Sequence, residues 1–190
     1  MTQLEEVEEL RWLREDLAYH QARVLLLTAA VAAAPGHQRK LDGLTKLAKL
    51  DFLVRYPALA PVILDALPWD DERLHLTDRE RIDPTDVEAP MVRYKYGPWD
   101  DRYHPVIGAL VSRGLLRYLA GRKGSVALAP TKLGRSLAAE LLSSEEWHDV
   151  ALRCQAIAEA SPNKSGAELK DLIYERLSDL MQTPQRRVIR

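Results

Sequence analysis

The amino-acid sequence predicts a mainly α-helical fold with one small β-hairpin. The first observation behind this prediction is a helix-forming stretch from Leu4 to Ala33 that contains neither proline nor glycine. The second is a pair of strand-like segments, "LLRYL" and "SVALA", joined by the glycine-containing turn "AGRKG". The third is a pair of amphipathic helical patterns near the end of the chain. A chain of 190 residues can bury a core of this kind.

The N-terminal helix is expected to cover residues 1–34. Its seam alternates steps of three and four residues, which is heptad spacing, at Leu10, Leu13, Leu17, His20, Val24, Leu27 and Val31. This spacing fits a coiled coil, but it also fits a long helix whose second half packs into the protein's own core. We favour the second interpretation because "RVLLLTAAVAAA" is apolar around most of its circumference. Leu10, Leu13 and Leu17 are candidates for contact with a partner.

A second helix is expected in "LDGLTKLAKLDFLVRYP", where apolar residues at helical spacing trace one stripe and Pro57 ends the helix. Lys46 and Lys49 fall together on the other face of this helix. Residues 68–90 follow after a short apolar segment. They have no clean period, contain three prolines and are rich in acidic side chains, so we expect an acidic loop insertion there.

Residues 91–142 carry the signals of a strand, a helix, a hairpin and another helix. "MVRYKY" alternates and is rich in aromatic and β-branched residues, which predicts a short strand ended by the glycine–proline pair that follows. Pro105 fits the first position of a helix, and Gly114 can supply its left-handed C-terminal cap. After the hairpin, the hydroxyl of Thr131 can cap the next helix.

The chain is expected to end in a pair of amphipathic helices at residues 143–182, separated by the linker "SPNKSG". A basic tail at residues 183–190 follows, and we expect it to be mobile. The predicted organisation is therefore an N-terminal helix at 1–34, a core at 35–142 that includes the acidic insertion, the helical pair and the tail.

In a winged helix-turn-helix the chain forms two helices, a third helix ended by glycine, a hairpin and another helix, in that order. The segment "HPVIGALVSRGLLRYLAGRKGSVALAPTKLGRSLAAEL" resembles the third helix, wing and following helix of MarR-like winged-helix proteins. The shared features are the glycine that ends the third helix and the pattern after the wing, here "LAPTKLGRSL". The resemblance implies a winged-helix core flanked by a long N-terminal helix and a C-terminal helical extension. It does not imply a function, because the same module serves transcription factors and architectural subunits.

Charge is segregated along the chain although the formal net charge is only −1. Residues 65–88 hold nine acidic and three basic side chains, whereas residues 91–135 hold nine basic and two acidic ones. Solvated loops would account for such runs, but a basic island on a winged helix favours an anionic partner. The candidates for contact with the phosphates of double-stranded DNA are Arg102, Arg113, Arg117, Arg122, Lys123 and Lys132.

The third helix is poorly equipped to read a DNA sequence. Opposite its buried stripe we expect Pro105, Gly108, Ala109 and Ser112, which are small groups with little hydrogen-bonding reach toward base edges. Contacts with phosphates are therefore expected in place of contacts with bases. The same smooth face would suit close packing against another protein.

Three aromatic residues lie next to this helix in the sequence, namely Tyr94, Tyr96 and Trp99. Their residue types are enriched in the hot spots of protein interfaces, so they are candidates for a partner interface. Packing in the protein's own core would account for them equally well.

The sequence carries no signal of catalysis. Its five histidines are scattered without metal-ligand spacing, and it has no phosphate-binding glycine loop, nucleophile elbow or acidic metal motif. The single cysteine, Cys154, excludes an intramolecular disulfide and a multi-thiolate metal site. We therefore expect no enzymatic activity and no cofactor. The lack of a signal-peptide pattern and of a long apolar stretch predicts a cytoplasmic protein with no membrane partner.

The combination of "KLDGLTKLAKLDFLVRYP" with "RYKYGPWDDRYHPVIGALVSRGLL" resembles the middle component of ABC-three-component systems, found in Lamassu-type antiphage defence. In that family an SMC-like or Rad50-like ATPase senses DNA, and a separate effector, often a nuclease, does the damage. The resemblance implies a non-catalytic adaptor that bridges these two subunits and touches the DNA backbone. The alternative is a winged-helix transcriptional regulator that binds DNA as a homodimer.

Overall fold

The computed structural model describes residues 17–190, which form a mainly helical protein with two small antiparallel sheets. The helices are α2 (Leu17–Ala33), α3 (Leu44–Arg55), α4 (Ala60–Ile63), α5 (Asp78–Ile82), α6 (Tyr103–Ser112), α7 (Lys132–Ser143), α8 (His148–Ala160) and α9 (Gly166–Arg176). The strands are β1 (Leu41–Asp42), β2 (Val92–Tyr94), β3 (Gly97–Trp99), β4 (Leu116–Ala120) and β5 (Val126–Pro130). The prediction of a mainly α-helical chain with a small β component is confirmed.

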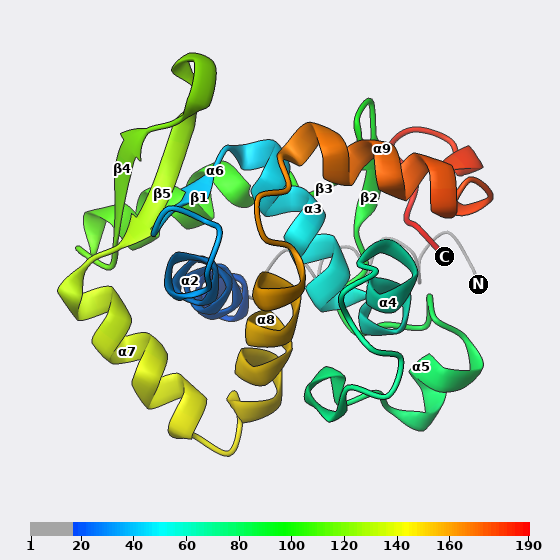
Figure 1. The fold of residues 1–190 in the computed structure, drawn as a ribbon, viewed down its shortest axis with the longest axis horizontal. Coiled ribbons are helices and arrows are strands. Elements are labelled where there is room, and N and C mark those ends of the chain that lie inside the picture. The colour runs from blue at the N-terminus through cyan, green and yellow to red at the C-terminus, as the bar shows by residue number, and fades with distance from the viewer. Residues whose placement is uncertain (1–16) are drawn as a thin grey trace.

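Helix α2 passes through one half of the molecule and packs against α6, α7, α8 and β5, as the view nearly along its axis in Figure 1 shows. Its seam residues Val24, Leu27 and Val31 are fully buried, so the second half of the predicted N-terminal helix lies in the protein's own core. Leu17, at the start of α2, is 42% exposed. Leu10 and Leu13 lie outside the described residues.

Helix α3 is buried around its whole circumference from Lys46 to Arg55, between α8, α9 and β3. The apolar stripe predicted from sequence is therefore only part of its buried surface. The face of Lys46 and Lys49 is buried as well, although lysine is rarely a core residue. Each ammonium group reaches a polar acceptor: Lys49 Nζ donates to the carbonyl of Pro98 at 2.9 Å, and Lys46 Nζ donates to His37 Nδ1 at 3.0 Å.

The larger sheet has three antiparallel strands in the order β1-β5-β4, and its β4–β5 hairpin projects from one side of the molecule (Figure 1). Helix α6 ends at Ser112, and Gly114 just after it, with a φ of +70°, supplies the predicted left-handed cap. The predicted cap of α7 is also present, because Thr131 Oγ1 accepts the backbone N–H of Gly134 at 3.0 Å. These two caps bring the chain from α6 into the hairpin and back onto the molecule.

The second sheet is the β2–β3 hairpin, which the sequence predicted only as a single strand. The glycine–proline pair that was expected to end that strand begins β3, since Gly97 adopts a φ of +91° at the turn. The C-terminal tail pairs with the other edge of β2 through a bridge between Val92 and Val188. Ile189 is fully buried and its carbonyl accepts a hydrogen bond from Tyr56 Oη at 2.9 Å. The tail is thus fixed to the core, contrary to the expectation of a mobile end.

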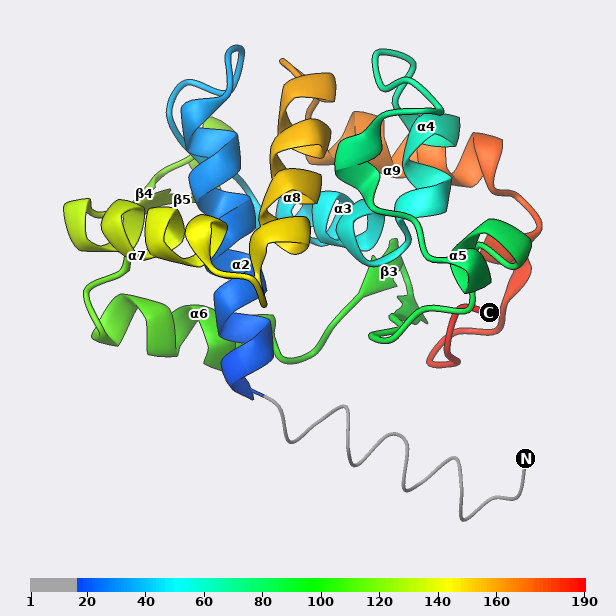
Figure 2. The same cartoon turned by 90° about the horizontal axis from the view of Figure 1, so that it is seen from below.

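Helices α8 and α9 pack against α3, and the acidic insertion lies beside α8 (Figure 2). The insertion is mostly loop, as predicted, and contains α5, whose start is held by a capping box between Thr77 and Glu80. Arg153 of α8 donates to the carbonyls of Leu74 and His75 and so attaches the insertion to the core. Helices α8 and α9 form the predicted C-terminal pair. Within residues 17–190, no helix is long and apolar enough to cross a membrane.

Candidate functional site: a basic hairpin and an aromatic pocket

The β4–β5 hairpin and the helix ends beside it carry an exposed group of basic side chains. Arg117 lies in β4, Arg122 and Lys123 form the tip, Arg113 follows α6, and Lys132 begins α7. Within residues 17–190, no hydrogen bond or ion pair is formed by the side chains of Arg113, Arg117, Lys123 and Lys132. The Nε of Arg122 lies 3.4 Å from Asp42 Oδ2. Four cations are therefore available to a phosphate backbone.

The tip of this hairpin is fastened to β1. The Oδ1 of Asp42 accepts the backbone N–H of Arg122 at 3.0 Å, and Lys40 Nζ donates to the carbonyl of Ala120 at 3.0 Å. Lys123 adopts a left-handed conformation with φ +51° at the turn. The basic tip is therefore held in a defined position relative to the helices.

Arg102 lies apart from the hairpin, immediately before α6. Its Nε and one terminal nitrogen donate to the carboxylate of Asp100 at 2.8 and 2.7 Å, and its backbone N–H donates to the same carboxylate at 2.9 Å. The Arg102 side chain is only 17% exposed. Of the six predicted phosphate contacts, Arg102 is the one that the protein engages most fully.

Asp100 belongs to a buried network of charged groups that joins α2, α3 and α6. At its centre the Asp51 carboxylate, which is fully buried, accepts hydrogen bonds from Arg23 Nε at 2.6 Å and from a terminal nitrogen of Arg55 at 2.7 Å. Arg55 also donates to Asp100 at 2.7 Å. Burial alone would raise the pKa of Asp51, but Arg23 and Arg55 hold that pKa well below its usual range. Both carboxylates of the network are therefore ionised at neutral pH.

The sequence did not predict this network. Asp51 and Arg55 are four residues apart on α3, which is the spacing of an ion pair on one helix face. That spacing was a usable signal. The partners Arg23 and Asp100 come from distant parts of the chain and carry no such signal.

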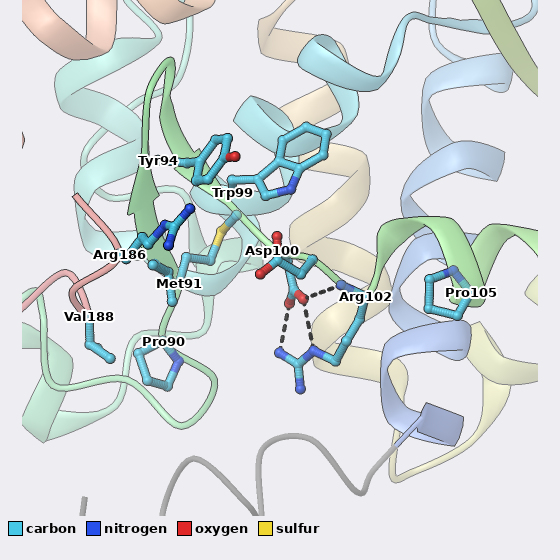
Figure 3. A pocket seen from close by; sticks show the side chains of 11 residues that line it. Pro90, Met91, Tyr94, Trp99, Asp100, Arg102, Pro105, Arg186 and Val188 are labelled. Atoms are coloured by element: carbon cyan, nitrogen blue, oxygen red, sulfur yellow. Dashed lines mark hydrogen bonds and ion pairs between the residues drawn. The ribbon is translucent and has the colours of Figure 1, made fainter. Parts of the chain in front are cut away.

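A pocket of about 540 Å³ opens between the β2–β3 hairpin, the start of α6 and the C-terminal tail (Figure 3). Tyr94, Trp99 and Arg102 line it together with Arg186 of the tail. Trp99 also packs edge-on against the ring of Tyr103, with ring centroids 5.3 Å apart. Two of the predicted interface aromatics thus share one pocket. Tyr96 does not line it and stands at the turn of the hairpin with 58% of its surface exposed.

The outer face of α6 is smooth, as the sequence predicted. Pro105, Gly108 and Ser112 are exposed, and Ala109 is half-buried. A Cβ atom added to Gly108 would meet no atom within 4 Å. Apart from the exposed ring of His104, this face offers no side chain with the length needed to reach base edges from a groove.

The described residues hold no cluster of metal-ligating side chains, and their one thiol is buried. Among residues 17–190, no group of three or more histidine, cysteine or acidic side chains could hold a metal ion. Burial raises the pKa of the Cys154 thiol to about 12, so this thiol is protonated and unreactive at neutral pH.

No protein-family model matches this chain, and no curated protein or solved structure matches it.

Proposed function

We propose that this chain is a winged-helix adaptor subunit without catalytic activity, which contacts the DNA backbone through its wing and a protein partner through α6. The winged-helix assignment is supported by the element order α2, β1, α3, α6, β4, β5 and by the strand order β1-β5-β4. In this assignment α6 is the third helix and the β4–β5 hairpin is the wing.

The observation that carries the proposal is that the exposed basic side chains surround the wing, whereas α6, the helix that would contact bases, has a smooth outer face. The side chains of Arg113, Arg117, Lys123 and Lys132 are exposed and unpaired within residues 17–190, and they surround the wing. The outer face of α6 is smooth and Arg102 at its start is bound to Asp100. Side chains of this kind bind phosphates without reading bases, and a flat helix face with an open glycine allows close approach of another protein.

The partners that we propose are an SMC-like, Rad50-like ATPase and an effector nuclease of a Lamassu-type antiphage system in the cytoplasm. The two sequence segments that resemble the middle component of such systems include α3, the β2–β3 hairpin and α6, so the resemblance covers two of the three helices that the buried network joins. A subunit with separate DNA-facing and protein-facing surfaces is suited to bridging an ATPase on DNA and an effector.

Co-purification with an SMC-like ATPase encoded beside the gene tests the adaptor role. Gly108→Leu should abolish co-purification, because a large side chain would stand on the docking face while the open space around Gly108 leaves the fold intact. Ala167→Leu, at an exposed position of α9, is the matched control and should co-purify as the wild type does.

The second candidate function is a transcriptional regulator, and the exposed basic wing is the observation that favours it. Such a protein should form a stable homodimer and bind one palindromic promoter far more tightly than random DNA. This behaviour, together with the lack of any ATPase partner, would replace the adaptor proposal.

A further inference from the structure

A second, smaller cavity lies at the base of the basic hairpin, on a different side from the aromatic pocket. Its volume is about 100 Å³, and its walls come from the loop after α2, from β1, from the start of α3, from the hairpin tip and from the loop before α9. About 10–15 Å³ of such volume is enough to hold one water molecule, so the cavity has room for several waters or one tetrahedral oxyanion.

Three cations line this cavity, namely Lys46, Arg122 and Lys164. Lys46 is 94% buried, since its exposed fraction is only 6%, and it forms no ion pair within residues 17–190. Its ammonium group has three N–H donors, and one of them is used by His37 Nδ1 at 3.0 Å. A buried charge without an opposite charge is costly, so an anion placed beside Lys46 would be bound favourably.

His37 cannot serve as the missing opposite charge. Its Nε2 donates to the carbonyl of Ala158 at 2.8 Å, which leaves Nδ1 as the acceptor for Lys46. Burial lowers the pKa of His37, which is consistent with a neutral ring. The pKa of Lys46 is lowered to about 8 by burial and by the charge of Arg122, so the ammonium group is still mainly protonated at pH 7.

Two helix N-termini meet at the same cavity. The first turn of α3 contributes Lys46, and Ser165, the N-cap of α9, lies in the wall. The two helix starts are in contact, because a Cβ atom on Gly166 would lie 2.6 Å from the backbone nitrogen of Lys46. The positive ends of both helix dipoles therefore add to the charge of the three cations.

Two acidic groups oppose this positive field. Asp42 lines the cavity, and its carboxylate holds the hairpin tip: Oδ1 accepts the backbone N–H of Arg122 at 3.0 Å, and Oδ2 lies 3.4 Å from the Nε of the same arginine. Glu168 is engaged by the capping box of α9, where it accepts the backbone N–H of Ser165 at 2.7 Å. Three cations and two helix ends outweigh these two carboxylates.

We propose that this cavity binds a phosphoryl group through Lys46, Arg122 and Lys164. A DNA phosphate as the occupant of this cavity rests on the proposed function, because Arg122 belongs to the tip of the wing. A phosphate of a DNA backbone and a free phosphate ion share the chemistry that the cavity recognises.

Titration with inorganic phosphate at pH 7 and constant ionic strength, followed by calorimetry, tests the site. We expect saturable binding of one phosphate to the wild type and at least about tenfold weaker binding to Lys46→Met, because a charge-assisted hydrogen bond is lost. Lys95→Met removes an exposed lysine at the turn of the β2–β3 hairpin, which does not line the cavity, and should bind phosphate as the wild type does. Unsaturable binding to the wild type, or equal binding to Lys46→Met, would overturn the proposal.

Lys164→Gln is a second test variant in case Lys46→Met does not fold, because Lys164 is a half-buried loop residue. Lys164→Gln should also weaken phosphate binding. A cooperative unfolding transition shows that each variant is folded. If both folded variants bind phosphate as the wild type does, the site is refuted. A duplex oligonucleotide then distinguishes the two sources. Competition between phosphate and the duplex identifies a backbone phosphate as the occupant, whereas simultaneous binding identifies free phosphate.

The same experiment separates this inference from the proposed function. Lys123→Glu should weaken binding of the duplex and leave binding of inorganic phosphate unchanged. If the wild type binds phosphate but no duplex, the DNA contact of the wing is wrong and the phosphoryl site stands. If the duplex binds and inorganic phosphate does not, the site is wrong and the wing contact stands.

Discussion

The carboxylate of Asp51 on α3 accepts a hydrogen bond from the hydroxyl of Tyr103 on α6 at 2.7 Å. The same carboxylate is bound by Arg23 of α2, so one buried group links three helices that are far apart in the sequence. Hydrophobic contacts are non-directional, whereas these hydrogen bonds require a defined angle and distance. The relative placement of α3 and α6, and hence the position of the α6 face, therefore depends on Asp51.

Replacing Asp51 with asparagine should destabilise the fold strongly. The change leaves Arg23 and Arg55 buried without their shared counter-charge, which costs about 3–5 kcal/mol of the free energy of unfolding. Urea unfolding followed by circular dichroism measures this loss. Asp149→Asn, at a largely exposed carboxylate 3.5 Å from His75, is the control and should unfold almost as the wild type does. Similar unfolding midpoints for both variants would show that the network does not hold the helices.

The stability of the protein should fall as the pH drops from about 7 toward 4. Burial and the nearby charge of Arg23 lower the pKa of His20 to about 3, so protons bind more readily to this histidine in the unfolded chain than in the folded one. The stability that neutral His20 contributes is present above the unfolded pKa of about 6.5 and is lost as the pH falls toward 3. The pKa of His37, also lowered by burial, acts in the same direction.

The pH dependence of the free energy of unfolding checks this expectation. His20→Gln should reduce the loss between pH 6.5 and 4.5, and His104→Gln, at an exposed position of α6, should leave it unchanged. The stability that ionised Asp51 and Asp100 contribute is lost at lower pH. Their pKa values are lowered in the folded protein, so this contribution is fully present above their unfolded pKa of about 4. An equal slope in the wild type and in His20→Gln would contradict the assignment.

Removing wing cations should weaken DNA binding equally for all sequences. Arg117→Ala and Lys123→Ala should each lower the slope of log K against log salt by about 1, because each removes one phosphate contact. Fluorescence anisotropy with two unrelated duplexes over a salt series gives this slope. Arg79→Ala, at an exposed arginine that pairs with Asp86 on the insertion, should have no effect. A loss of sequence preference at unchanged slope would show that these residues read bases.

Two helix glycines should respond in opposite directions to alanine. Gly108→Ala on α6 should raise the free energy of unfolding by about 0.5–1 kcal/mol, because the added Cβ meets open space and alanine favours the helix. Gly134→Ala on α7 should lower it by more than that, because its Cβ would lie 2.0 Å from the carbonyl oxygen of Leu115. Thermal unfolding of the two variants compares them directly. Destabilisation by Gly108→Ala would show that the α6 face is not open.

Truncating Ile189 should loosen the C-terminal tail and the whole fold. Ile189→Ala removes most of a fully buried side chain and should cost about 2–5 kcal/mol. Val126→Ala, at an exposed position of the hairpin, is the matched control for loss of an aliphatic side chain and should change stability little. Denaturant unfolding measures both, and equal midpoints would contradict the docking of the tail.

The sequence by itself determined the helices and caps that depend on local signals. The cap of α6 at Gly114 and the cap of α7 at Thr131 could be predicted because each rests on one residue whose conformation or hydroxyl meets the local need. The smooth face of α6 and the basic hairpin could be predicted for the same reason, since residue type and helical period are both local. These features account for the candidate wing and for the face opposite the buried stripe.

Only the tertiary structure decided where the buried charges and the tail lie. Lys46, Lys49 and Asp51 have the polarity of surface residues, and their burial follows from packing α3 between α8, α9 and β3. Ile189 and its partner Tyr56 are separated by more than half of the chain, so no local pattern joins them. The small cavity at the base of the hairpin likewise gathers side chains from distant segments. Such contacts depend on the distance between atoms in space, which residue spacing along the chain does not encode.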